Sequence, residues 1–205
     1  MKYPLESTLF YPVLALLVLA VFYGIYFTKM ILQRRHGIHT HQIGRRKEKE
    51  LHRVEQWMSV ATLGIVIVQL ASIIFGWNHM PSNGRFFTGF LLGLFGDLIF
   101  LISVIVMKDS WRAGIPDTDK TELVTGGIYR FSRNPAFLGF DLMYLGVLLM
   151  YFNGAALLFT LFAITMLHCQ ILQEEKFLAA TFGQSYLEYK EQVCRYLGRK
   201  KKKEL

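Results

Sequence analysis

The sequence predicts an all-α polytopic membrane protein with about five transmembrane helices and a C-terminal amphipathic helix on the cytoplasmic side. Three observations predict this fold. Hydrophobic residues make up 53% of the 205 residues, they gather in long runs, and the basic residues fall between those runs. A soluble helical domain is excluded, because so few polar residues could not cover so many apolar segments.

A helix needs roughly 17–25 consecutive apolar residues to cross a bilayer. The first three runs meet this length, and the first is too long for the core of a signal peptide, so we expect it to act as a membrane anchor. The last two runs are shorter, and Asn153-Gly154 between them is a turn signal, so they predict a helical hairpin. Within a single membrane-embedded domain, 1–205, the predicted spans are 9–32, 57–77, 86–107, 136–152 and 155–172.

The distribution of basic residues predicts the orientation. The chain has a net charge of +8 and 23 Lys and Arg residues, and only Lys2 and Arg85 do not fall on one side of the predicted spans. The positive-inside rule then places the N-terminus outside and the C-terminus in the cytoplasm. A membrane accounts for this charge, including the basic tail 199–205, so no nucleic acid partner is expected. No Cys and His spacing predicts a metal site.

Polar residues gather where the fourth span begins. Asn134 is a favourable N-cap and Pro135 suits the first helical position, so a helix is predicted to start there. A helix N-terminus attracts negative charge, and Arg130 and Arg133 would add to that field. The alternative is that these arginines only mark the inner interface.

Two adjacent acids follow the fifth span on the same side of the membrane. Glu174 and Glu175 would face the arginines across the hairpin, and residues 185–197 predict an amphipathic helix that includes Tyr186 and Tyr189. The cytoplasmic segments 108–135 and 173–198 are therefore predicted to form a polar pocket beside lipid. Charge alone does not identify its ligand.

Acidic residues within spans are functional candidates by default. Asp141 lies near the inner rim and could line the same pocket. Asp97 is deeper, and its alternative role is a hydrogen bond between helices. Gly89 and Gly93 form a pair of small residues that predicts close packing with another helix.

Three blocks of sequence resemble a known family. "ELVTGGIYRFSRNPAFLGF", "QEEKFLAATFG" and "YLEYKEQVCR", within residues 122–195, are similar in order and spacing to motifs of the integral-membrane methyltransferases. That family includes isoprenylcysteine carboxyl methyltransferase and the phospholipid N-methyltransferases. The resemblance implies S-adenosylmethionine as methyl donor, S-adenosylhomocysteine as product, and a helical membrane fold that supplies the site.

The resemblance also implies roles for individual residues. Arg133 would bind the donor carboxylate, while Glu174 and Glu175 would bind its ammonium group and ribose. Tyr129 and Phe137 would flank the adenine or the sulfonium. The implied cofactor-binding residues are Tyr129, Arg130, Arg133, Asn134, Pro135, Phe137, Leu138, Gly139, Glu174, Glu175, Tyr186 and Tyr189, and the candidate catalytic residues are Arg195 and Asp141.

The departures from the family pattern bear on the acceptor. Asn134 stands where His is usual, and Gln192 stands where the eukaryotic enzyme has a basic residue that Arg195 would replace. These features favour a bacterial-type member in an inner membrane. The acceptor would be lipophilic, either a prenylcysteine-like carboxylate, a lipid head group or a small thiol. A non-catalytic membrane binding or assembly protein is the alternative. A reductase of the sterol-reductase type is a third possibility, which is disfavoured because such proteins have more membrane spans than this chain.

Overall fold

The structure of the chain is a computed structural model, and it describes residues 5–38, 49–112 and 122–200. Of the predicted basic tail, residues 201–205 lie outside this part. Among the described residues there are helices and one isolated antiparallel bridge, Val193–Arg199, but no strands. The elements are α1 (Leu5–Arg35), α2 (Lys49–Ile74), α3 (Asn83–Met107), α4 (Pro135–Met150), α5 (Gly154–Phe182) and α6 (Gln184–Gln192), with short 3-10 turns η1 (Lys108–Ser110) and η2 (Gly127–Arg130).

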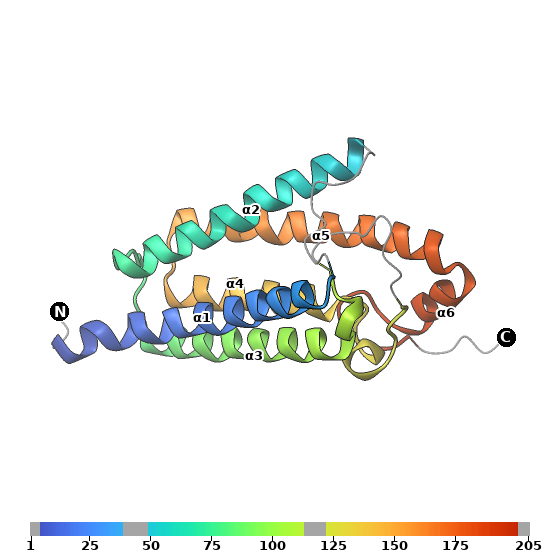
Figure 1. Cartoon of the computed structure of the whole chain (residues 1–205). Helices are drawn as coiled ribbons and strands as arrows, with labels where there is room; N and C mark the ends of the chain where they lie inside the picture. Colours follow the sequence, from blue (N-terminus) through green and yellow to red (C-terminus); the bar gives the residue numbers. More distant parts are fainter. Residues whose placement is uncertain (1–4, 39–48, 113–121, 201–205) are drawn as a thin grey trace.

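The prediction of an all-helical polytopic membrane protein is confirmed. Four of the described helices, α1, α2, α3 and α5, are long and apolar enough to cross a membrane. The remaining predicted span corresponds to α4, an apolar helix of 16 residues. In Figure 1 the long helices run roughly along one direction, with α2 beside α5 and α1 near α3 and α4.

The C-terminal helices agree with the predicted segments in part. The fifth span was predicted over 155–172, and its helix, α5, continues past that span without a break to Phe182 and stops at Gly183, whose φ is +53°. Glu174 and Glu175 therefore lie on the wall of a long helix. The amphipathic helix ends at Gln192 instead of 197, because Cys194 N–H donates to Gly198 O at 2.9 Å and turns the chain back.

Glycines bring the backbones of α3 and α4 together. A methyl group on Gly146 of α4 would lie 2.6 Å from the carbonyl oxygen of Gly89, and one on Gly96 would lie 2.8 Å from the oxygen of Gly139. The predicted packing role of Gly89 is thus confirmed, with α4 as its partner. Gly93 also packs closely, against Gly146 and against Val18 of α1.

Asn153 fixes the turn between α4 and α5 at the end of the molecule away from α6. Its side-chain oxygen accepts from Ala156 N–H at 2.9 Å and caps α5. Its amide donates to Ser72 Oγ of α2 at 2.8 Å and to the carbonyl oxygen of Trp77 at 3.0 Å. One side chain therefore caps the hairpin and joins it to the end of α2.

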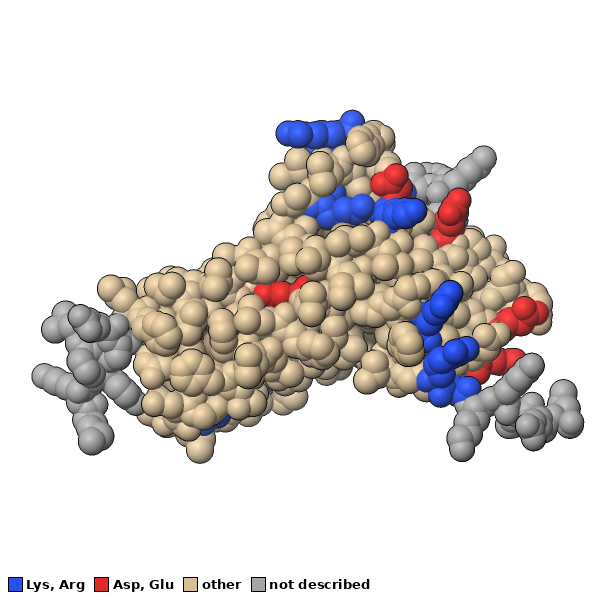
Figure 2. Space-filling model, turned by 90° about the horizontal axis from the view of Figure 1, so that it is seen from below, with Lys and Arg blue, Asp and Glu red and all other residues tan. Residues whose placement is uncertain are grey.

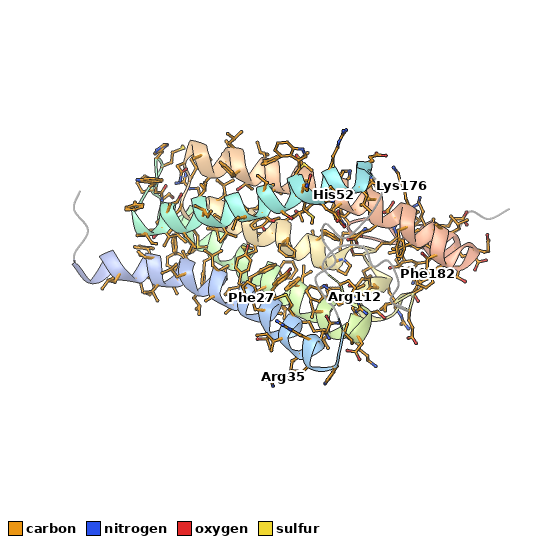
Figure 3. The ribbon with its side chains drawn as sticks, turned by 45° about the horizontal axis from the view of Figure 1, so that its top comes forward. Phe27, Arg35, His52, Arg112, Lys176 and Phe182 are labelled. Carbon is orange, nitrogen blue, oxygen red and sulfur yellow. The ribbon has the colours of Figure 1, made fainter. Side chains whose placement is uncertain are left out.

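Charged residues concentrate toward the end of the molecule that carries α6. In Figure 2 most of the Lys, Arg, Asp and Glu side chains visible on that face lie over this half, while the half nearer the N-terminus is largely uncharged. Figure 3 places His52 of α2, Arg112 after η1 and Lys176 of α5 in this same half. The charge separation is that of a membrane protein with one strongly basic face.

The α3–α4 contact generates a stability prediction. Gly146→Ala would push a methyl group against the backbone of Gly89 and Gly93, and backbone atoms cannot move aside as a flexible side chain can. We expect a loss of about 1–3 kcal/mol, as for other overpacked interiors, measured as a lower midpoint of thermal unfolding in detergent. Gly24→Ala is the matched control, because no atom lies within 4 Å of the added methyl group. Equal midpoints for the two variants would contradict the role given to this contact.

Candidate active site

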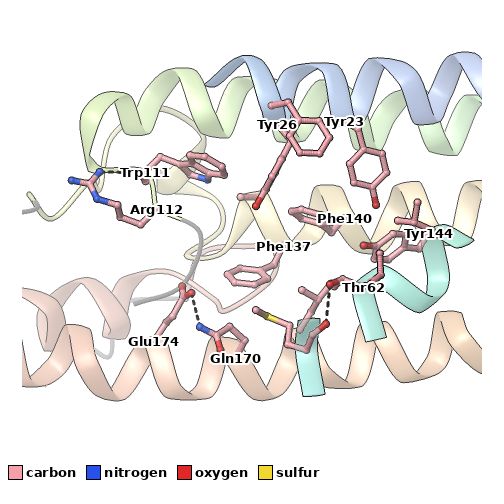
Figure 4. Close-up of a pocket in the computed structure, with 16 residues that line it drawn as sticks. Tyr23, Tyr26, Thr62, Trp111, Arg112, Phe137, Phe140, Tyr144, Gln170 and Glu174 are labelled. Carbon is pink, nitrogen blue, oxygen red and sulfur yellow. Dashed lines mark hydrogen bonds between the residues drawn. The ribbon is translucent and has the colours of Figure 1, made fainter. Parts of the chain in front are cut away.

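A cavity of about 370 Å³ lies between α1, α2, α4 and α5 (Figure 4). Most of its lining is apolar or aromatic, and the polar side chains that carry charge lie at one end. The lining residues are Tyr23, Tyr26, Phe27, Met58, Thr62, Leu63, Val66, Trp111, Arg112, Ala136, Phe137, Phe140, Tyr144, Leu167, Gln170 and Glu174.

The charged end of the cavity lies where α4 begins. Glu174 and Gln170 are one turn apart on α5, and Gln170 Nε2 donates to Glu174 Oε1 at 3.2 Å. Within the described part of the chain, Glu174 forms no ion pair, and Gln170 Oε1 is buried without a hydrogen-bond partner. Arg112 approaches from the segment after η1, where its guanidinium donates to the carbonyl oxygen of Trp111 at 2.9 Å. This end thus offers a carboxylate, an amide oxygen and a guanidinium.

The other end of the cavity reaches the outer surface between α1 and α2. Phe27 and Leu63 line the cavity, yet their side chains are 49% and 63% exposed. Both belong to helices that are apolar and long enough to span a membrane, so this exposed surface would face lipid. An apolar molecule in the bilayer could enter here without crossing water.

A buried ion cluster lies beside the cavity. Arg133 Nη2 donates to Glu175 Oε1 at 2.6 Å, with both side chains about 5% exposed. Arg195 Nε and Nη2 donate to the two oxygens of Glu175 at 2.9 Å each, in a bidentate pair. The hydrogen bond to Glu175 raises the pKa of the Arg195 guanidinium, so the cluster is one carboxylate between two permanent cations.

This cluster attaches the C-terminal segment to the helical hairpin. Arg133 Nη1 also donates to the carbonyl oxygens of Lys190 at 3.0 Å and Val193 at 3.3 Å, and its backbone N–H donates to Cys194 O at 3.1 Å. The Asn134 amide donates to Arg195 O at 3.2 Å. Asn134 therefore precedes α4, as predicted, but its side chain does not cap the helix. It binds the C-terminal segment instead.

Three predicted cofactor-binding tyrosines lie on α6 or are bound to it. Tyr186 and Tyr189 pack against the end of α5, and Tyr189 Oη donates to Tyr129 O at 2.7 Å. Burial raises the pKa of Tyr186 to about 12 and raises the pKa of Tyr129 and Tyr189 as well. All three are neutral at physiological pH. None of them lines the cavity.

The remaining predicted site residues are dispersed. Arg130 is exposed, and Gly139 packs against the backbone of α3. Pro135 is buried and Leu138 is partly buried, both outside the cavity lining. Asp141 also lies outside the lining, with its Oδ1 buried and unpartnered.

A further contact joins α5 to the C-terminal segment: His168 Nδ1 and Tyr196 Oη lie 2.6 Å apart, and their rings stack. Of the predicted set, the structure brings Phe137 and Glu174 to the cavity and places Arg133, Glu175 and Arg195 in the ion cluster.

Several cavity residues were not predicted from the sequence. Tyr23 and Tyr26 belong to the first span, for which only anchoring was expected, and Gln170 was not assigned a site role. Trp111 and Arg112 stand in "SWRAGI" after the third span, inside the segment 108–135 that was predicted to form the pocket, although neither residue was singled out there. No local pattern marks which face of α1 turns toward the cavity, because that helix is apolar all round.

Comparison with known proteins identifies the family. Residues 84–185 match the family described as phospholipid methyltransferase. A rice protein named "Probable protein-S-isoprenylcysteine O-methyltransferase" is 30% identical over 110 residues, which is 52% of this chain and 58% of that protein. The fission yeast Schizosaccharomyces pombe protein named "Protein-S-isoprenylcysteine O-methyltransferase" is 38% identical over 72 residues, 35% of this chain and 30% of that protein. The chain belongs to the integral-membrane methyltransferase family.

The region that matches the family covers one wall of the cavity and not the opposite wall. It contains α3, α4 and α5 and ends at Ser185, so it includes Phe137, Gln170 and Glu174. The helices α1 and α2, which supply the opposite wall, lie outside it. The chain spans 58% of the length of the rice relative that it matches. The family match covers the half of the chain that carries the charged end of the cavity.

The ion cluster generates a second stability prediction. Glu175→Ala would leave Arg133 buried without its carboxylate, and breaking a buried pair in this way costs about 3–5 kcal/mol. We expect the variant to unfold at a clearly lower temperature and to expose residues 190–200 to protease.

Lys176→Ala is the matched control on the next residue. Its 4.0 Å pair with Glu50 is largely exposed, and such pairs contribute little. Protease resistance of the C-terminal segment in Glu175→Ala equal to that in Lys176→Ala would contradict the attachment role.

Proposed function

We propose that this protein is a membrane-embedded methyltransferase that uses S-adenosylmethionine to methylate a lipophilic acceptor. One observation supports this most strongly: a single cavity joins a charged end, near the start of α4, to an apolar end that opens on the lipid-facing surface. A water-soluble donor and a lipid acceptor can meet only in a space with both properties. Membership of the methyltransferase family supports the same reaction.

The residues at the charged end fit the donor. S-adenosylmethionine carries an ammonium group, a carboxylate, ribose hydroxyls and an adenine ring. The Glu174 carboxylate and the unpartnered Gln170 Oε1 are acceptors suited to the ammonium group or the ribose. Arg112 would attract the carboxylate, and Phe137 offers an aromatic face to the adenine or the sulfonium.

When bound, S-adenosylmethionine supplies a methyl group on a positively charged sulfur, which is a good leaving group. The protein therefore needs to align the acceptor with that methyl group and exclude water. The apolar walls formed by Phe140, Leu167 and Met58 suit this task, since they leave a nucleophile weakly solvated. The fixed carboxylate of Glu174 would add electrostatic orientation at the charged end.

The ion cluster has a different role in this proposal. Arg133 and Glu175 bind each other and the backbone of the C-terminal segment, and Arg195 completes the pairing. We assign them to positioning the wall of the site, in place of the direct donor contacts and catalytic role first expected of them. Asp141 stays a candidate catalytic residue, as the sequence suggested, although its side chain lies outside the cavity lining.

The basic end of the molecule would face the cytoplasm, where the donor is available. Described basic residues at helix ends on this side include Arg34 and Arg35 of α1 and Lys108 after α3. The Asn134-Pro135 pair favours a bacterial inner membrane through the family resemblance. The names of the rice and yeast relatives favour oxygen as the methyl-accepting atom.

The first experiment is calorimetric binding of S-adenosylhomocysteine to the full chain in phospholipid nanodiscs. We expect binding by the wild type, weakened about tenfold or more in Glu174→Gln, because the amide oxygen still accepts a hydrogen bond but lacks the negative charge that strengthens it. Lys176→Ala should bind as the wild type does, since its side chain is exposed away from the cavity. Absence of binding by folded wild type would contradict the proposed function, and full affinity in Glu174→Gln would contradict the assigned donor end.

A further inference from the structure

The apolar part of the cavity contains two tyrosine hydroxyls that face each other. Tyr144 of α4 is fully buried, and among the described residues its Oη has no hydrogen-bond partner apart from a loose contact with the Oη of Tyr23 on α1. Within the same part of the chain, the buried Oη of Tyr23 likewise has only this contact. Both rings line the cavity, and Figure 4 shows their hydroxyl groups turned toward each other from opposite walls.

Such an arrangement leaves at least one O–H proton without an acceptor unless a ligand completes it. Buried tyrosine hydroxyls normally find a hydrogen-bond partner, because an unsatisfied polar group loses its water and gains nothing in return. Two of them on facing helices form a polar point inside an otherwise apolar space. A hydroxyl can donate and accept, so the pair can still donate a hydrogen bond to one ligand oxygen atom placed beside it.

The pair is well separated from the charged end of the cavity. Ala136 lies near the start of α4 and Tyr144 eight residues further on, which corresponds to roughly 12 Å along the helix axis at about 1.5 Å per residue. Both residues line the cavity. A methyl acceptor that reaches from Glu174 to Tyr144 would have its reacting group at the charged end. The oxygen atom bound by the tyrosine pair would then lie within the apolar body of the acceptor, away from that reacting group.

Only one of the two tyrosines lies in the segment that matches the methyltransferase family. Tyr144 lies within the segment that matches the methyltransferase family, residues 84–185, whereas Tyr23 lies outside it. Of the other lining residues, Phe27, Met58 and Leu63 also lie outside it. The helices α1 and α2 thus supply a wall that the family description does not specify, as expected for the part that selects the acceptor.

We propose that Tyr23 and Tyr144 form a recognition site for a carbonyl or hydroxyl oxygen in the interior of the lipid acceptor. The acceptor class is then a lipid whose apolar body carries such an oxygen, in contrast to an unbroken hydrocarbon chain. This inference rests on the proposed function, because it concerns the acceptor half of the same cavity.

The test compares two tritiated probes that differ by one oxygen. One is a long-chain primary alcohol, and the other is the same alcohol with a ketone in mid-chain, roughly 12 Å from its hydroxyl. Binding to the full chain in nanodiscs is measured by scintillation proximity. We expect the wild type to prefer the ketone about fivefold, the size of one hydrogen bond. Tyr144→Phe and Tyr23→Phe should each reduce this preference, and the double variant should abolish it while still binding the plain alcohol.

Tyr151→Phe is the matched control, because Tyr151 is a buried tyrosine outside the cavity lining. It should keep the wild-type preference. Removing the hydroxyl of Tyr144 loses only its loose contact with Tyr23, so the midpoint of thermal unfolding should change little and loss of preference would not reflect loss of fold. Equal binding of the two alcohols by the wild type, or a preference retained in the double variant, would overturn the recognition site.

Binding of S-adenosylhomocysteine separates this inference from the proposed function. All tyrosine variants should bind it as the wild type does. If S-adenosylhomocysteine binds but neither alcohol does, the acceptor site is overturned and the donor site stands. If the ketone preference is present but S-adenosylhomocysteine does not bind, the methyltransferase proposal fails while the tyrosine pair remains a lipid site.

Discussion

The carboxylate of Glu175 is buried at the edge of a helix that is long enough to span a membrane, where an unpaired charge would cost several kcal/mol. Its bidentate pair with Arg195 and its contact with Arg133 remove that cost. Arg133 precedes α4 and Arg195 follows α6, so pairing both with α5 determines where those segments lie. The start of α4, the end of α5 and the C-terminal segment are held together because one negative charge has to be satisfied.

The cavity depends on this attachment in an indirect way. Glu174 is the neighbour of Glu175 on α5, and the two side chains point to different sides of the helix. One faces the ion cluster and the other faces the cavity. A helix rotation that exposed Glu174 more fully would pull Glu175 from its two cations. The adjacent acids therefore form a structural residue and a candidate ligand-binding residue with a fixed relative orientation.

Much of the fold follows from the sequence because apolar length and charge placement are strong constraints in a membrane. The helices, the turn at Asn153 and the packing role of Gly89 were all predictable on these grounds. The candidate site was less accessible. The sequence predicts that Arg133 and Glu175 lie on the same side of the membrane with opposite charges. It does not show whether the two side chains bind each other or a ligand. Tyr23 lies in a helix that is apolar all round, so only tertiary packing reveals which face meets the cavity.

The position of the opening between α1 and α2 has a consequence for the lipids that the protein can use. Phe27, at the opening, lies eight residues before the end of α1 at Arg35, or roughly 12 Å of helix, while the hydrocarbon core is about 30 Å thick. In the proposed function, the opening would therefore serve the bilayer leaflet next to the basic end. Acceptors would be drawn from that leaflet and products returned to it, and a lipid in the opposite leaflet would have to cross the bilayer first.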